Sequence, residues 1–205
     1  MSAKVTHLFV KRANGTPVEP VSELTVSPDE GILGGVPGPK LRQVLMLSRE
    51  SLDRFDLKPG QLKENILIEG CDVQLLESGT VLSIGTAKIG VNFHCEVCHK
   101  IKDIANTRQI QHQRGVLGTV VTEGIISVGD EVREGEVLFE PVPYDIAERI
   151  RWYFARHGEP IEATRLVQEI GLSQSYCRAL PAYLKRVPEH RDKVIFKSGK
   201  QTFAN

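Results

Sequence analysis

One stretch of the chain, from Val91 to Ile101, concentrates the side chains that could carry chemistry. It contains two of the four cysteines, Cys95 and Cys98, and two of the six histidines, His94 and His99. Thiolate and imidazole groups bind soft metals, and a thiolate also carries sulfur or attacks electrophiles. This stretch is therefore the first candidate for a functional site.

Two metal-centred interpretations have little support in the sequence. Structural zinc usually takes two closely spaced pairs of ligands, but Cys71 and Cys177 stand alone, so zinc is not expected. The segment from Cys95 to His99 also fits the C-x-x-C-H pattern of c-type haem attachment. Haem is not expected either, because that attachment normally follows export and the N-terminus lacks a hydrophobic core of signal-peptide length.

Two other interpretations are open. The cysteines could be an inert pair in an apolar core, although His94, Glu96 and Lys100 indicate a partly solvated segment. They could instead form a reactive site, because nearby cations and the N-terminus of a helix over 101–104 would favour a thiolate. A second cysteine three positions away could then resolve a persulfide or a disulfide.

The bulk composition is that of a soluble folded protein, with 40% hydrophobic and 25% charged residues among 205. The formal net charge is zero, so overall charge favours neither nucleic acid nor a membrane. No window approaches the ~18 apolar residues that a membrane span needs, and a cytoplasmic location is expected. From Tyr144 onward, eleven Lys and Arg stand against seven Asp and Glu, which indicates two modules with different partners.

Residues 1–142 are predicted to be a mainly β domain. Short runs rich in β-branched residues and bounded by turn dipeptides are typical of strands, and these runs are 5–10, 18–26, 42–47, 65–69, 81–85, 87–93, 118–123, 125–128 and 136–142. Their number and spacing predict a closed or nearly closed barrel. Ser48 is expected to cap a short helix over 51–55. The glycine-rich loop over 31–39 could cradle a phosphate or a cofactor, although a plain surface loop would look the same.

Residues 144–205 are predicted to form a second, helical domain. Apolar residues at helical spacing predict helices over 146–157, 160–170 and 173–185, with Pro181 kinking the third, followed by a hairpin over 193–196 and 201–203. This order of elements is the outline of a winged helix-turn-helix. Its basic residues include Arg178, Lys185 and Arg186, which could meet nucleic-acid phosphates. The alternative is a small helical cap with a solvated basic face.

Taken together, the motifs of the first domain resemble those of the MOSC domain family, named after the C-terminal part of molybdenum-cofactor sulfurases. The landmarks occur in the family's order: Gly31-Ile32-Leu33-Gly34, Arg42-Gln43-Val44, Pro59-Gly60, Glu64-Asn65-Ile66, Ser78 to Gly85, Cys98, Arg114 to Gly118, and Gly129-Asp130. The resemblance covers roughly residues 1–142. One departure is that the family's early loop often continues with Asp and His, where this chain has Gly34-Gly35-Val36.

The resemblance implies a β barrel with a functional cysteine in a cleft. Family members carry sulfur on that cysteine as a persulfide, or hold the molybdenum cofactor with the cysteine as metal ligand and reduce N-hydroxylated substrates; pyridoxal phosphate binding is also implied. Cys98 is then the carrier or metal ligand and Cys95 its helper, while Arg42, Asn65 and Arg114 are expected to bind the cofactor. The implied partners are this cofactor or another small molecule and a sulfur-donor protein, and the enzyme class would be a sulfurtransferase or a cofactor-dependent reductase.

A different class of function is also open for the second domain. Ser175 to Leu180 is similar to the recognition helix of DNA alkyltransferase-like proteins, but the alkyl-accepting cysteine has no counterpart, since Glu189 stands in its place. Repair by alkyl transfer is therefore not expected. A DNA-binding regulator with the barrel as its sensor is the alternative to the sulfur or cofactor function.

Overall fold

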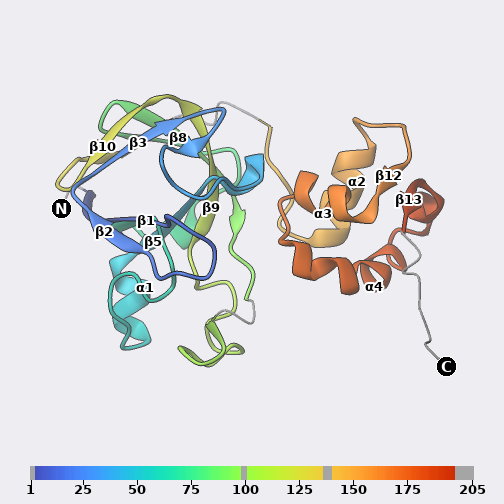
Figure 1. The fold of residues 1–205 in the computed structure, drawn as a ribbon, viewed down its shortest axis with the longest axis horizontal. Coiled ribbons are helices and arrows are strands. Elements are labelled where there is room, and N and C mark those ends of the chain that lie inside the picture. The colour runs from blue at the N-terminus through green and yellow to red at the C-terminus, as the bar shows by residue number, and fades with distance from the viewer. Residues whose placement is uncertain (1–2, 98–100, 136–139, 197–205) are drawn as a thin grey trace. The chain divides into compact units, whose positions relative to one another are not determined.

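The computed structural model describes residues 3–97, 101–135 and 140–196. It divides into two compact units, Met1–Tyr144 and Asp145–Asn205, each with its own hydrophobic core. The first unit is mainly β and the second is mainly helical (Figure 1).

One eight-stranded sheet forms most of the first unit. Its strands are β1 (Lys4–Val10), β2 (Glu19–Val21), β5 (Val44–Ser48), β6 (Ile66–Glu69), β7 (Val81–Ile84), β8 (Ala87–His94), β9 (Val116–Thr122) and β11 (Val132–Glu134), in the order β11-β7-β8-β9-β5-β6-β1-β2. The β5–β6 pair is parallel and the other pairs are antiparallel.

The sheet closes on itself where β1 meets the start of β11. Lys4 and Glu131 form an isolated bridge, the Val5 amide donates to Asp130 O over 2.9 Å, and the Gly129 amide donates to Val5 O over 2.8 Å. A smaller sheet of β10 (Gly124–Ser127), β3 (Glu23–Ser27) and β4 (Gly31–Ile32) adds side chains to the same core. The predicted mainly β barrel is confirmed.

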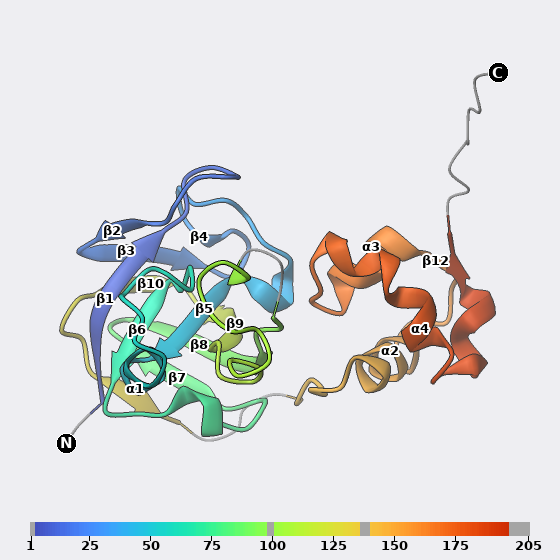
Figure 2. The ribbon, with the colours of Figure 1, turned by 90° about the horizontal axis from the view of Figure 1, so that it is seen from below.

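Strands β5 and β6 are buried on both faces, which explains their nearly continuous apolar sequence. Met46 and Ile66 face the barrel core, whereas the alternate residues Leu47 and Leu67 pack on the opposite face with Leu52. Leu52 belongs to α1 (Arg49–Arg54), which lies beside these strands (Figure 2). The outer cluster also includes Leu62, Ile101 and Ile110, so it packs against the segment that follows the cysteines.

Two local predictions for the first unit need comment. Among its described residues the last strand is β11, which was not predicted and which the turn at Gly129-Asp130 returns directly onto β7. Of the predicted strand 136–142, residues 136–139 lie outside the described residues, and 140–142 are not in a strand. Ser48 does stand at the N-cap of α1, but its hydroxyl makes no capping bond and instead accepts from the Val73 amide over 2.8 Å.

The second unit contains three α-helices among its described residues: α2 (Ile146–Phe154), α3 (Ala163–Glu169) and α4 (Leu180–Leu184). The predicted third helix is divided into a 3-10 turn, Gln174–Arg178, followed by α4. The division is explained by Pro181, which has no amide hydrogen and lies in the first turn of α4, where none is needed.

The predicted wing takes a different form where the structure describes it. Strand β13 (Val194–Ile195) pairs in parallel with β12 (Ile161–Glu162), a distant segment of the same unit, and residues 201–203 lie outside the described residues. No described helix combines the length and the apolar character that crossing a membrane requires.

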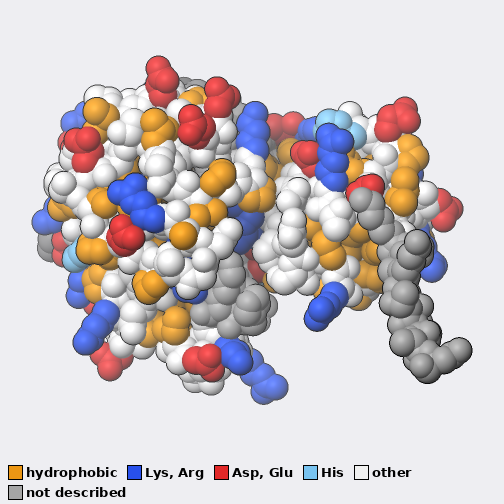
Figure 3. Space-filling view, viewed as in Figure 1, with side chains coloured by type: hydrophobic (Ala, Val, Ile, Leu, Met, Phe, Trp, Pro, Cys, Tyr) orange, Lys and Arg blue, Asp and Glu red, His pale blue; other side chains and the backbone are white. Residues whose placement is uncertain are grey.

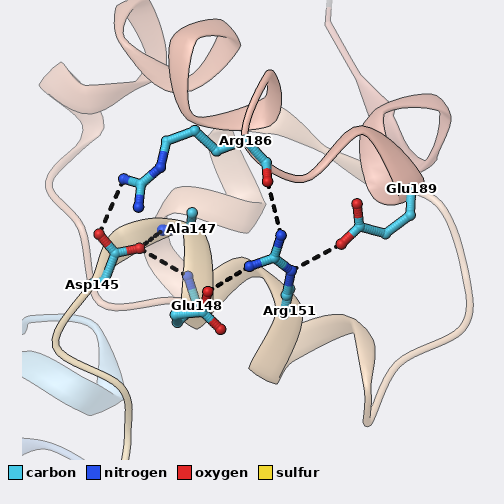
Figure 4. A network of polar contacts seen from close by, with 6 residues as sticks. All are labelled: Asp145, Ala147, Glu148, Arg151, Arg186 and Glu189. Atoms are coloured by element: carbon cyan, nitrogen blue, oxygen red, sulfur yellow. Dashed lines mark hydrogen bonds and ion pairs between the residues drawn. The ribbon is translucent and has the colours of Figure 1, made fainter.

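The start of α2 is held by a polar network (Figure 4). Asp145 accepts from the Ala147 amide over 2.9 Å and the Glu148 amide over 3.1 Å, and pairs with Arg186 over 3.0 Å. Arg151 donates to Arg186 O over 2.8 Å and pairs with Glu148 and Glu189. The network ties the first turn of α2 to the residues that follow α4.

Asp145→Ala is expected to lower the free energy of unfolding of the second unit by about 1–2 kcal/mol, since it removes an N-cap and an exposed ion pair. Urea denaturation of the full chain, followed by Trp152 fluorescence, measures the change. Asp192→Ala is the matched control, because Asp192 is exposed and makes no side-chain hydrogen bond or ion pair within the described residues. Equal midpoints for the two variants would contradict the capping role.

Candidate functional site

The cysteine segment leaves the barrel at the end of β8. Cys95 directly follows that strand, is 2% exposed, and donates its amide to Gly115 O over 2.8 Å. Cys98, the residue expected to act as carrier or metal ligand, lies outside the described residues together with His99 and Lys100. The segment resumes at Ile101 in a series of turns, so the predicted helix over 101–104 does not form as a regular helix.

Arg42 lies directly beside this segment. Its guanidinium pairs with Glu96 Oε2 over 2.8 Å and lies 3.8 Å from Cys95 Sγ. Both charged side chains are largely buried, with 17% and 15% exposed, so the pair is shielded from solvent. A 3-10 turn at Lys40–Arg42 positions the arginine, and Asn92 of β8 holds that turn by donating to Leu41 O over 3.0 Å. The Cys95 sulfur also lies 3.9 Å from Glu96 O.

Arg114 fixes the same segment from the other side. It is 5% exposed, donates to Glu96 O over 2.9 Å, and lies within 3.5 Å of Leu62 O. Arg42 therefore holds the side chain of Glu96, and Arg114 holds its backbone. Arg114 is buried in this bonding and does not line the cation-rich pocket described below.

Glu64 is a fully buried carboxylate near Arg114. Burial raises its pKa, although hydrogen bonding from the Gly60 amide and the charge of Arg114 oppose that shift. The folded state therefore binds more protons than the unfolded state at pH values between the ordinary glutamate pKa and the raised one. In that window Glu64 makes the unfolding free energy fall as the pH rises.

Glu64→Gln should remove this contribution while keeping an acceptor for the Gly60 amide. We expect its unfolding free energy, relative to the parent chain, to increase as the pH rises from 4 to 7. Denaturant titrations at several pH values measure the difference, with the exposed Glu30→Gln as control. Parallel pH profiles for parent and Glu64→Gln would show that the buried carboxyl is not the source.

His94 is positioned by partners other than the thiols. Its Nε2 lies 2.9 Å from Gln74 O, and its ring packs 4.6 Å from the Tyr144 ring and 5.6 Å from the His112 ring. The Tyr144 hydroxyl donates to Leu76 O over 3.0 Å, and burial raises the pKa of that phenol. These contacts fix the end of β8 immediately before Cys95.

A pocket of about 120 Å³ opens on the other side of Arg42. Arg42 shares its wall with two further cations, Lys11 and Lys63, and with the glycine-rich loop at Gly35 and Val36. Among the described residues that line it, none is acidic; the others are Val10, Ile32, Gln43 and Asn65. The three lining cations, of which Arg42 is also paired with Glu96, give this small pocket a positive character that suits an anion such as phosphate. We call it the cation pocket.

The cation pocket brings together some expected residues and adds others. Arg42 lies in it, and Asn65 lines it, but the Asn65 side chain is engaged with the Leu45 amide over 2.9 Å and with Phe9 O over 3.2 Å. Asn65 therefore joins β1 to β5. Lys11 and Lys63 were not predicted. The position of Lys63 directly before the Glu64-Asn65-Ile66 motif is the sequence feature that could have indicated it.

The residues expected to meet nucleic acid lie in the second unit. Arg178 and Lys185 are exposed, whereas the Arg186 guanidinium is paired with Asp145. On the face that Figure 3 shows, cationic and anionic side chains are interspersed. Among the residues that the structure describes, no group of three His, Cys, Asp or Glu side chains is arranged to hold a metal.

Comparisons with known proteins agree with this architecture. The model of the MOSC domain family matches residues 34–133. The YuaD protein from Bacillus subtilis is 18% identical with a TM-score of 0.56, covering 64% of this chain and 94% of that one. YiiM from Escherichia coli is 19% identical with a TM-score of 0.53, and the match covers 91% of this chain and 94% of that one. YiiM from Geobacillus stearothermophilus is 18% identical with a TM-score of 0.53, and the match covers 89% of this chain and 99% of that one. No curated protein matches the chain. At these identities the solved structures show a shared fold.

Proposed function

Because residues 34–133 of this chain are a MOSC domain, we propose that the first unit binds the molybdenum cofactor, with Cys98 as the protein ligand of the metal. The observation that carries the proposal is the cation pocket and its link to the cysteine segment. Arg42 lines that pocket and also contacts Cys95 and Glu96. The cofactor joins a soft metal to an anionic phosphate, and it therefore needs both a thiolate and a cluster of cations.

Each residue of the site has a role in this function. Arg42, Lys11 and Lys63 bind the phosphate, and the glycine loop lets the backbone approach it closely. Arg114 and Arg42 hold Glu96 from two sides, so the segment leading to Cys98 leaves β8 in a fixed direction. Bound there, the cofactor would supply redox chemistry at molybdenum.

Sulfur carriage on Cys98 is the second candidate from the same resemblance. Cys95 is 2% exposed, so it is poorly placed to receive sulfur from a donor protein. A persulfide carrier has no need of a pocket with three cations. That difference favours cofactor binding, while pyridoxal phosphate binding stays an expectation from the resemblance.

Molybdenum and pterin content separates the two candidates. The full chain is produced in a host that makes the cofactor, purified, and analysed for metal, pterin and cysteine persulfide by mass spectrometry. Cofactor binding predicts molybdenum and pterin in equal amounts approaching one per chain. A persulfide on Cys98 without pterin would instead establish sulfur carriage.

Nucleic-acid binding by the second unit stays a prediction. Arg178 and Lys185 are exposed, but the pairing of Arg186 with Asp145 reduces the number of unpaired cations in this region. A mobility-shift assay of the full chain at two salt concentrations tests it, since phosphate contacts weaken steeply with salt. Binding without salt dependence, or no binding, would remove this alternative.

A further inference from the structure

A second pocket, of about 560 Å³, lies next to the cation pocket and differs from it in character. Its walls are mainly apolar, with Phe9, Val18, Ile104 and the prolines Pro17, Pro20 and Pro59. Gly15, Thr16, Gly60, Gln61 and Lys63 complete the lining. Small-molecule sites are typically mostly apolar, have volumes of about 300–1,000 Å³, and carry few polar groups. This depression, which we call the apolar pocket, matches them in volume and lining and is open to solvent on one side.

Lys63 is the single charged residue among the described residues that line the apolar pocket. Within the described part of the chain its ammonium group makes no ion pair and no side-chain hydrogen bond, so its charge is available to a ligand. Its backbone is in the left-handed region, with φ 63°, and its amide donates to Gly60 O over 3.0 Å. Such a conformation is unfavourable for a lysine and is characteristic of functional sites.

Gly60 shapes the floor of this pocket. Its φ is 87°, and a Cβ there would lie 3.1 Å from Phe9 Cε1 and 3.4 Å from Val18 Cγ2. Because it has no side chain, Gly60 can pack directly against Phe9, which is 5% exposed, and against Val18. The prolines and the half-buried Val18 then provide the apolar surface that a planar ring could contact.

We propose that the apolar pocket binds a small planar aromatic anion, with its ring against Val18 and the prolines and its carboxylate or similar group paired with Lys63. Apolar walls alone would accept any ring, and the unpaired ammonium selects the rings that carry a negative charge. This proposal shares Lys63 with the cation pocket, so a cofactor phosphate bound there would compete for its ammonium group, and the binding test uses chain purified without cofactor.

Two probes of equal shape test the proposal on the full chain: 2-naphthoate, which is an anion, and 2-naphthamide, which is neutral. NMR titration of nitrogen-15-labelled protein measures both affinities and locates the site. We expect naphthoate to bind about tenfold more tightly, as for one hydrogen bond to a charged group, with saturable shifts at Val18, Gly60 and Gln61. Equal affinities, or shifts at Lys11 and Gly35 instead, would overturn the proposal.

Two substitutions sharpen the test. Gln61→Glu keeps the acceptor that bonds the Lys58 amide over 2.7 Å but places a negative charge in the wall, so it should weaken naphthoate about tenfold and leave naphthamide unchanged. Lys63→Met should abolish the preference for the anion, whereas the exposed Lys58→Met should keep it. Because Gln61 lies outside the cation pocket, Gln61→Glu should retain the molybdenum and pterin content of the parent chain. A loss of cofactor without a loss of naphthoate binding would overturn the assignment of Gln61 to the apolar pocket.

Discussion

Cys98→Ser is expected to reduce the molybdenum and pterin retained by the purified chain at least tenfold. A serine hydroxyl is a hard, protonated group at neutral pH, so it replaces a soft thiolate ligand poorly. Metal analysis and pterin fluorescence of protein from a cofactor-producing host measure the loss. The cations of the neighbouring pocket remain in this variant, so any residual binding reports the contribution of the phosphate site alone.

Cys71→Ser is the matched control for that substitution. Cys71 is half-buried, and burial together with Glu134, Asp72 and Glu50 raises the pKa of its thiol. It is therefore kept as a neutral thiol and is a poor metal ligand. Equal molybdenum content in Cys98→Ser and Cys71→Ser would remove Cys98 from the site.

Arg42→Met is expected to weaken cofactor retention about 10–100-fold, because a hydrogen bond to a charged group contributes about 1.5–3 kcal/mol. The substitution removes one cation of the pocket and leaves the largely buried Glu96 carboxylate without its 2.8 Å partner. Release of cofactor during dialysis at rising salt concentration measures the effect. Arg42→Lys should restore only part of the affinity, since an ammonium group cannot make the paired contacts of a guanidinium.

The control for Arg42 is Arg49→Met. Arg49 also pairs with a carboxylate, Asp53, at 3.0 Å, but that pair is exposed on α1 and lies outside the cation pocket. It should retain the cofactor as the parent chain does. Equal losses in both arginine variants would show that Arg42 acts through general stability, and the link between the pocket and the cysteine segment would then have no functional support.

The fold was largely predictable because strand patterning is local. Apolar alternation placed β1 and β6 to β9 within a few residues, and the resemblance supplied the order of the landmarks. The differences arose where pairing with a segment distant in the sequence determines whether a strand forms. Strand β11 is determined by its pairing with β7, and Val194–Ile195 pairs with Ile161–Glu162 across the second unit. No local pattern encodes such pairings.

The candidate site was predictable only in part, for the same reason. Arg42 and Cys95 were expected, and their side chains lie together although 53 positions separate them in the sequence. Lys11 and Lys63 were missed because a lysine at the end of a strand or in a turn looks like any solvated lysine until the fold places both beside Arg42. Asn65 lines the cation pocket, but its side chain joins two strands, and its expected contact with a cofactor stays a prediction.

Cofactor binding at this site can be examined directly in a crystal structure of the chain purified with the cofactor. We expect density for molybdenum at the Cys98 sulfur and for the cofactor phosphate within hydrogen-bonding reach of Arg42, Lys11 and Lys63. A phosphate bound away from these three cations, or molybdenum held without the Cys98 sulfur, would show that the proposed site is wrong.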